Sequence, residues 1–140
     1  MPASPRTRTT AHPGPHLGLW ALHDLHLHNY LRYAALLLTP ADAGRAVHDA
    51  FDELAGRWPD VLAAASPAAC AWQAVRRHVR TLAGPRPLHP VAHLTDPQQD
   101  VLLLHLVLGL PQSEVAAVTG TEPAAVHVQI RSLAGARRPA

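Results

Sequence analysis

Residues 112–133, QSEVAAVTGTEPAAVHVQIRSL, decide the fold that this sequence predicts. The stretch from Gln112 to Thr119 predicts a short helix, and the stretch from Pro123 to Leu133 predicts a slightly longer one. Between them lies a three-residue turn that begins with Gly120. A short helix, a turn containing glycine and a second helix follow the helix-turn-helix plan.

The second helix of this pair has two different faces. Val126, Ile130 and Leu133 recur at steps of four and three, so they anchor the helix on a core. The other positions face outward, where a recognition helix meets the major groove of DNA. Glutamine can pair with adenine, arginine can pair with guanine, and alanine methyl groups can touch thymine. A helical hairpin without a DNA role is the alternative. The outward positions are Ala124, Ala125, His127, Val128, Gln129 and Arg131.

Helical patterns also fill the sequence before this pair. One helix is expected from Leu17 to Leu38, and Asp42 opens a second that ends at Trp58-Pro59. Ser66-Pro67 caps a third helix, in which Trp72, Val75, Val79 and Leu82 face inward while Arg76, Arg77 and Arg80 face outward. No β-alternation exceeds about four residues. The predicted fold is therefore all-α, with two small helical domains.

A capped apolar helix is expected directly before the helix-turn-helix. Thr95 and Gln98 have capping-box spacing. The run from Val101 to Leu108 is apolar almost all round, so we expect it to be buried on most sides, and Gly109 ends it. Breaks in composition divide the chain into a disordered tail at 1–16, a helical domain at 17–83, a proline-rich linker at 84–93 and a helix-turn-helix domain at 94–135. The linker is short, so we expect the two halves to pack together.

Composition excludes several classes of protein. Of the 140 residues, 48% are hydrophobic, which supports a buried core, but no apolar run approaches the roughly 20 residues of a membrane span. The first residues lack a secretory signal, so we expect a cytoplasmic protein without membrane insertion. The net charge of +2 permits a nucleic-acid partner without requiring one. Arginine without lysine indicates codon bias in a GC-rich bacterial genome.

The sequence holds no arrangement of residues that predicts catalysis. It has no Gly-x-Ser-x-Gly motif and no glycine loop that binds phosphate, so we expect neither an enzyme nor a cofactor. The single cysteine excludes an internal disulfide and a cysteine-cluster zinc site. His23, His26 and His28 lie close together, but no carboxylate or cysteine completes a tetrahedral set. We therefore interpret them as surface histidines and predict no metal.

The stretch from Leu94 to Leu133 resembles region 4 of the sigma-70 family, especially its extracytoplasmic-function (ECF) group. Leu25 to Leu38, Pro40-Ala41-Asp42-Ala43 and Val47 to Trp58 resemble region 2 of the same group. Ala71-Trp72 lies where that family places the tryptophan of its third helix.

The resemblance implies a transcription initiation protein that binds RNA polymerase core and directs it to the −10 and −35 elements of promoter DNA. An anti-sigma or other regulatory protein would be a further partner. The implied polymerase contacts are Arg45, Asp49 and Asp52; the contacts to −10 DNA are Arg76, Arg77 and Arg80; and the contacts to −35 DNA are the six outward positions given above. A solvated helix face is the alternative for each set.

Several positions depart from the family pattern, which marks a diverged member. Gly44-Arg45-Ala46 replaces an acidic pair, and His127 and Gln129 stand where the family carries lysine and arginine. Without these two phosphate-binding cations, the slope of the logarithm of the DNA-binding constant against the logarithm of salt concentration would be smaller by about two. The helix that carries Arg76, Arg77 and Arg80 ends the first domain at Leu82-Ala83-Gly84, whereas the family has a longer basic helix there. It also has few aromatic residues to stack unpaired bases. The alternative function is therefore a degenerate sigma-like module that binds polymerase or a protein partner without melting promoters.

Overall fold

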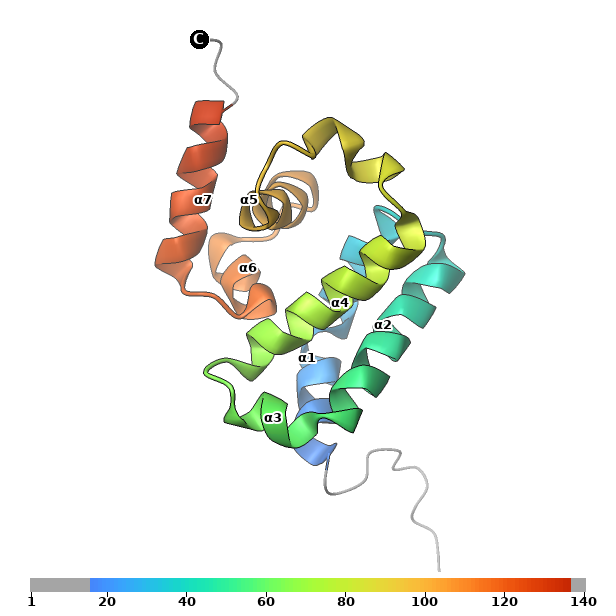
Figure 1. The fold of residues 1–140 in the computed structure, drawn as a ribbon. Coiled ribbons are helices and arrows are strands. Elements are labelled where there is room, and N and C mark those ends of the chain that lie inside the picture. Colours follow the sequence, from blue (N-terminus) through green and yellow to red (C-terminus); the bar gives the residue numbers. More distant parts are fainter. Residues whose placement is uncertain (1–15, 137–140) are drawn as a thin grey trace, which may run out of the picture.

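The computed structural model of the protein describes residues 16–136, and every regular element in this range is a helix (Figure 1). The predicted all-α class is confirmed. The expected tail lies outside the described residues except for residue 16. None of the described helices combines the length and the apolar character that a membrane span requires. The elements are α1 Leu17–Ala35, α2 Pro40–Gly56, α3 Trp58–Ala63, α4 Pro67–Ala83, η3 Arg86–Val91, α5 Asp96–Val101, η4 Leu102–Val107, α6 Gln112–Thr119 and α7 Pro123–Ala136.

Side-chain caps fix the starts of three helices, as the sequence predicts for two of them. The Ser66 hydroxyl accepts a hydrogen bond from the Ala69 amide at the start of α4, at 3.0 Å. At the start of α5, the Thr95 hydroxyl accepts from the Gln98 amide and the Gln98 side chain accepts from the Thr95 amide, which completes a capping box. Thr39 caps α2, which therefore begins at Pro40 rather than Asp42.

Three predicted details of the N-terminal helices are wrong. The first helix ends at Ala35 rather than Leu38. Trp58-Pro59 begins the short helix α3, because a proline in the first turn of a helix loses no hydrogen bond there. Leu82 lies at the end of α4 and is 43% exposed rather than buried.

The apolar run after α5 also departs from its prediction. It forms a π-helix, η4, in which the Leu108 amide donates to the Leu103 carbonyl five residues earlier. Leu103 and Leu104 face the core, whereas Leu106 and Val107 are 42% and 55% exposed. The expectation of burial on most sides is wrong for these two side chains, because they lie on the side of η4 that faces away from the core.

Helices α1–α4, which we call the N-terminal half, pack around large aromatic side chains. The rings of Tyr33 and Trp72 meet edge to face, with centroids 4.7 Å apart, and Tyr30 packs against Phe51 at 5.7 Å. All four side chains are buried. In Figure 1, α2 and α4 run side by side along this core.

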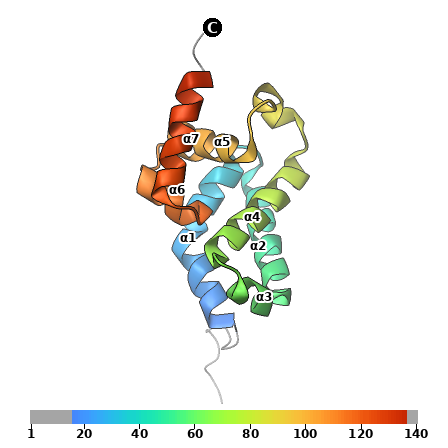
Figure 2. The ribbon, with the colours of Figure 1, turned by 60° about the vertical axis from the view of Figure 1, so that its left-hand side comes forward.

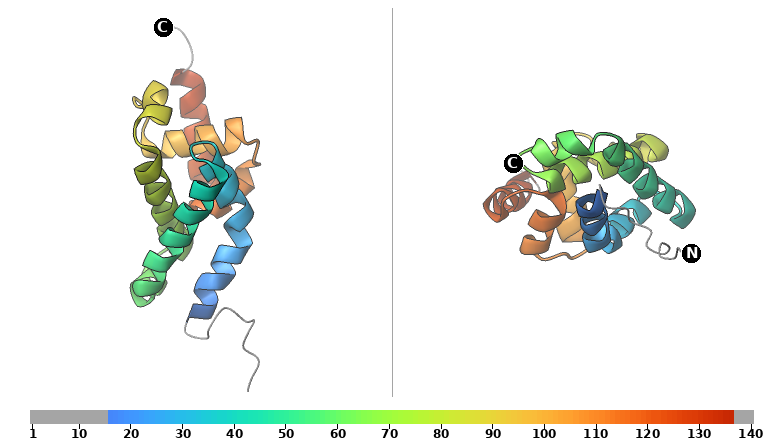
Figure 3. Two further views of the ribbon diagram at one scale, coloured as in Figure 1. Left: turned by 90° about the vertical axis from the view of Figure 1, so that its right-hand side faces the viewer. Right: turned by 90° about the horizontal axis from the view of Figure 1, so that it is seen from below.

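Helices α5–α7 with η4, the C-terminal half, have apolar side chains that join the same core. Leu104, Val115, Val118, Val126 and Leu133 are buried there. Helix α6 contacts both α4 and α1, and Figure 2 shows it beside them. Helix α7 lies at the outer edge of the molecule in Figures 1 and 3. The two halves therefore pack together with one face of the helix-turn-helix still facing solvent.

Candidate nucleic-acid interface

The turn between α6 and α7 begins at Gly120, where the sequence predicts it. Gly120 ends α6 in the left-handed region, with φ 70° and ψ 30°, which glycine adopts without steric cost. The Thr121 amide donates to the Ala116 carbonyl at 3.0 Å. The buried Thr119 hydroxyl donates to the Val115 carbonyl at 2.8 Å, so the hydrogen-bonding capacity of this polar side chain is satisfied inside the protein. The segment forms a helix-turn-helix.

Helix α7 presents most of its predicted outward positions to solvent. Val126 and Leu133 are each 2% exposed and anchor the helix, while Ile130 is half-buried. Among the outward positions, only Gln129 is half-buried. The exposed ones are Ala124, Ala125, His127, Val128 and Arg131.

The predicted outward direction of Arg76 and Arg80 is wrong, because both reach across to α5. Arg76 donates to Asp100 from Nε at 3.1 Å and to Asp96 from Nη1 at 3.1 Å. Arg80 donates to the other oxygen of Asp96 at 2.9 Å and to the Gln99 amide oxygen at 2.7 Å. Two arginines four residues apart on α4 thus meet two aspartates four residues apart on α5.

Asp100 is the buried centre of this polar contact between the halves. It is 4% exposed, and its second oxygen accepts from the Trp72 indole Nε1 at 2.9 Å. Burial disfavours the guanidinium charge of Arg76, but its hydrogen bond and attraction to Asp100 outweigh that cost and raise its pKa. The hydrogen bond from Arg80 holds the pKa of Asp96 below its usual range. We call this set the latch: Trp72, Arg76, Arg80, Asp96, Gln99 and Asp100.

Arg77 points away from the latch and pairs within the N-terminal half. It donates to both oxygens of Glu53 on α2, at 2.8 and 2.7 Å, and His78 lies 2.9 Å from the same carboxylate. Burial alone would raise the pKa of Glu53, but the hydrogen bonds from His78 and Arg77 outweigh it and lower that pKa. The Arg77 side chain remains 50% exposed.

The three residues that the resemblance implies as polymerase contacts all lie on the exposed face of α2. Arg45 pairs with Asp42 at 2.6 Å, and His48 lies 3.6 Å from Asp52. Asp49 is exposed beside them. The ligand atoms of His48, Asp49 and Asp52 lie within 4.8 Å of one another, but this is a solvent-exposed cluster to which the described part of the chain adds no further ligand.

The histidines of α1 do not form a common surface set. His28 is exposed, and His23 packs edge-on against Phe51 with ring centroids 4.9 Å apart. His26 is only 7% exposed and lies against Tyr30, so the prediction of a surface histidine is wrong for this residue. Sequence spacing alone did not show that α6 covers this part of α1.

We expect His26 to make stability fall in mild acid. Burial lowers its pKa from 6.5, although attraction to the Glu114 carboxylate opposes the shift. As the pH falls, His26 therefore binds a proton at a higher pH in the unfolded chain than in the folded protein. The contribution of neutral, buried His26 to the free energy of unfolding is fully present above pH 6.5 and declines as the pH falls toward the pKa of the folded state. Urea unfolding between pH 8 and 5 should show that the free energy of unfolding declines less with falling pH for His26→Gln than for wild type.

The exposed His28 provides the matched control for that comparison. His28→Gln removes an exposed imidazole from the same helix, and it should leave the pH slope of the unfolding free energy as in wild type. Equal slopes for His26→Gln and His28→Gln would contradict the assignment of the acid sensitivity to His26.

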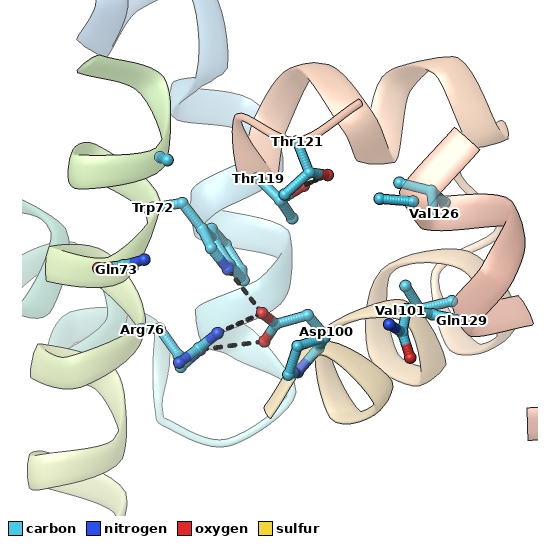
Figure 4. A pocket seen from close by; sticks show the side chains of 12 residues that line it. Trp72, Gln73, Arg76, Asp100, Val101, Thr119, Thr121, Val126 and Gln129 are labelled. Atoms are coloured by element: carbon cyan, nitrogen blue, oxygen red, sulfur yellow. Dashed lines mark hydrogen bonds and ion pairs between the residues drawn. The ribbon is translucent and has the colours of Figure 1, made fainter. Parts of the chain in front are cut away.

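The turn of the helix-turn-helix is itself part of the contact between the halves. A Cβ on Gly120 would lie 2.2 Å from the Ala69 nitrogen of α4, so the two backbones touch. The Ser66 hydroxyl donates to the Gly120 carbonyl at 3.2 Å. A cavity of about 240 Å³ lies beside this contact, with Trp72 and Arg76 on one wall and Gln129 on the other (Figure 4).

The helix-turn-helix, its exposed second helix and the capped helix before it fit a known family. Residues 91–131 match the family model for sigma-70, region 4. Comparisons with curated proteins and with solved structures find no match. The sigma-70 region 4 segment runs from the end of η3 to the middle of α7, so it contains the Gly120 turn and the exposed face of α7 but none of α1–α4.

Within the sigma-70 region 4 segment, the aspartates of the latch are the polar residues that sequence reasoning missed. Their sequence context explains why, since Asp96 fits the start of a helix and Asp100 belongs to no motif. A signal was present, because Arg76 and Arg80 share the four-residue spacing of Asp96 and Asp100. The pairing became visible only with the relative placement of α4 and α5.

Proposed function

We propose that the protein is a diverged sigma factor of the ECF group, which binds RNA polymerase core and directs it to promoter DNA. The observation that carries the proposal is the exposed face of α7 across the Gly120 turn, within the segment that matches sigma-70 region 4. The family match covers only that segment, so the roles of the N-terminal half are part of the proposal.

In this proposal α7 reads the −35 element. Gln129 and Arg131 offer the hydrogen bonds that recognise adenine and guanine, and Ala124 and Ala125 offer methyl contacts to thymine. His127 and Val128 complete the exposed face. Arg131 is the only arginine among the six positions, so the salt dependence of binding should be shallow. Tethering to polymerase would compensate by raising the effective DNA concentration.

The N-terminal half is the part that we assign to RNA polymerase. Arg45, Asp49 and Asp52 lie exposed on one face of α2, so they are available to a protein surface. We propose the domain division 17–83 and 94–135, a cytoplasmic location and an anti-sigma protein as a further partner. Arg76, Arg77 and Arg80 would face −10 DNA once they are released from their carboxylate partners.

A second candidate function is a sigma-like module that binds polymerase or a regulatory protein without melting DNA. The pairing of Arg76, Arg77 and Arg80 with carboxylates favours this alternative, because these are the cations expected at the −10 element. Transcription by RNA polymerase loaded with the protein separates the two functions. Transcripts support the sigma factor, and binding to polymerase without transcripts supports the module that does not melt DNA.

We expect α7 to determine which DNA the protein selects. Selection of duplexes from a random-sequence library by the full chain should enrich a common sequence. Replacing Gln129 and Arg131 together by alanine should weaken binding to the enriched duplex by about 1–3 kcal/mol for each base that the variant no longer recognises. The enriched sequence should change at the positions that these side chains read.

Arg86→Ala is the matched control, because it removes an exposed arginine on η3, outside the helix-turn-helix. The control should select the same sequence with nearly the same affinity. Equal selections by the wild type and the α7 variant would contradict the assignment of α7, and absence of any enriched sequence would contradict DNA recognition by the free chain.

A further inference from the structure

We infer that the cavity between α4 and the helix-turn-helix binds a small, neutral ring compound that carries an amide-type edge, which is a hydrogen-bond donor next to an acceptor. Such a ligand is neither a nucleic acid nor a protein, so this site goes beyond both proposed functions. We call the space the interface cavity, and its lining side chains are drawn in Figure 4.

The interface cavity has a buried floor and an open rim. Trp72, Val101 and Val126 are buried and make the floor apolar, whereas Gln73 and Thr121 are exposed at the rim. The volume of about 240 Å³ lies just below the range of about 300–1,000 Å³ that is typical for drug-sized ligands. The fitting ligand is therefore a molecule of one or two rings that enters from the rim.

The contacts around the interface cavity hold its walls in place. A Cβ on Gly120 would lie 2.2 Å from the Ala69 nitrogen, so the two backbones cannot move closer together. Arg76 donates to Asp100 at 3.1 Å and fixes the opposite end. Protein interiors are close-packed, with few voids larger than a water molecule. A space of this size between such tight contacts indicates a preformed site, in which binding requires little rearrangement of the protein.

Two side-chain amides line the interface cavity from opposite sides. Gln73 belongs to α4 and Gln129 belongs to α7 (Figure 4). Within residues 16–136, neither of these side chains has a hydrogen-bond partner. A glutamine amide offers an N–H donor and a carbonyl acceptor side by side. The complementary ligand carries the same two groups in the reverse order, which is an amide-type edge.

A pair of threonine hydroxyls adds an acceptor to the same cavity. The Thr119 hydroxyl donates its single hydrogen to the Val115 carbonyl at 2.8 Å. Thr121 is therefore the donor in the 2.9 Å contact between the Thr119 and Thr121 hydroxyls. The lone pairs of the Thr121 oxygen remain available to an N–H group of a ligand.

The charges at the floor are balanced within the protein, so the ligand that fits is neutral. Asp100 accepts from the Trp72 indole at 2.9 Å and from the Arg76 guanidinium, whose charge it neutralises. A charged ligand would lose hydration without gaining an unpaired partner of opposite charge. Benzamide meets these requirements, because it has one ring and a neutral amide edge. Benzoate has nearly the same shape but carries a charge and lacks the N–H donor.

The test is a titration of the ¹⁵N-labelled full chain with benzamide, followed by NMR. We expect a dissociation constant of about 1–10 mM, as for a one-ring ligand of ordinary efficiency. The backbone signals of Ala69 and Thr121 and the indole signal of Trp72 should shift. The indole signals of Trp20 and Trp58 should stay in place, because neither side chain lines the cavity. Benzoate should bind at least about tenfold more weakly.

Two substitutions locate the hydrogen bonds to the ligand. Gln73→Ala and Gln129→Ala should each weaken the binding of benzamide by about two- to tenfold, the range expected for one net hydrogen bond. Gln73 is exposed, so its replacement leaves the fold intact. Thr81→Ala is the matched control, because Thr81 is also an exposed polar residue of α4 but lies outside the cavity. It should bind benzamide as the wild type does.

Three results would overturn the assignment of a ligand site. The first is the absence of shifts in the cavity signals at the highest soluble concentration of benzamide, and the second is equal binding of benzoate. The third is one dissociation constant shared by Gln73→Ala, Gln129→Ala and Thr81→Ala. None of these results affects the proposed functions, which DNA selection and transcription test separately.

Discussion

Replacing Gly120 with alanine should lower the free energy of unfolding by about 2–5 kcal/mol, the largest effect of any single methyl group that we predict. An L-residue in the left-handed region costs about 1–2 kcal/mol. The added Cβ would also lie 2.2 Å from the Ala69 nitrogen and 2.6 Å from its Cα, and overpacking against such neighbours costs a further 1–3 kcal/mol, roughly. Urea unfolding of the full chain measures the change.

Two other glycines separate the contributions to that loss. Gly84 has φ 75° and ψ −178°, a region that essentially only glycine adopts, but nothing lies within 4 Å of an added Cβ. Gly84→Ala therefore reports backbone strain alone, about 1–3 kcal/mol. Gly44 lies inside α2 with open space around it, so Gly44→Ala should stabilise the protein by up to about 1 kcal/mol. A smaller loss of unfolding free energy for Gly120→Ala than for Gly84→Ala would contradict the close contact between the halves.

Replacing Asp100 with asparagine should lower the free energy of unfolding by about 2–4 kcal/mol. The substitution keeps the shape of the side chain but removes the charge that balances Arg76, and it places an amide group where the Trp72 indole or the guanidinium requires an acceptor. Breaking one partner of a buried ion pair is costly because the other charge stays in a medium of low dielectric constant. Asp96 remains near Arg76 and limits the loss.

Asp52→Asn is the control for the loss of one aspartate charge. Its carboxylate and His48 are each 67% exposed, and the two groups lie 3.6 Å apart. Water screens such a pair, so the substitution should change stability by less than about 1 kcal/mol. Similar unfolding curves for the two variants would show that the latch contributes no stability to the contact between the two halves.

The sequence predicted the elements whose signals are local. Ser66-Pro67 and the Thr95–Gln98 pair mark helix starts because a hydroxyl and a first-turn proline satisfy the free amide groups there. Gly120 marked the turn because no other residue adopts its backbone conformation as readily. These features depend on a few neighbouring residues, so spacing in the chain was sufficient to place them.

The features that sequence reasoning missed depend on contacts between distant segments. Arg76 and Arg80 were expected to face solvent, since nothing within α4 pairs with them; their partners lie on α5. His26 was expected at the surface, and its burial shows only once α1 lies in the fold. Trp58-Pro59 predicts the end of a helix, but α3 begins there, because proline also fits a first turn.

Transcription by reconstituted polymerase tests the central claim most directly. Core RNA polymerase from a bacterium, loaded with the purified full chain, is given a library of genomic DNA fragments, and the transcripts are sequenced. The account predicts discrete start sites that share an upstream sequence and that disappear when Gln129 and Arg131 are replaced by alanine. Stable association with core polymerase without any transcripts, or transcripts that are indifferent to those two substitutions, would contradict it.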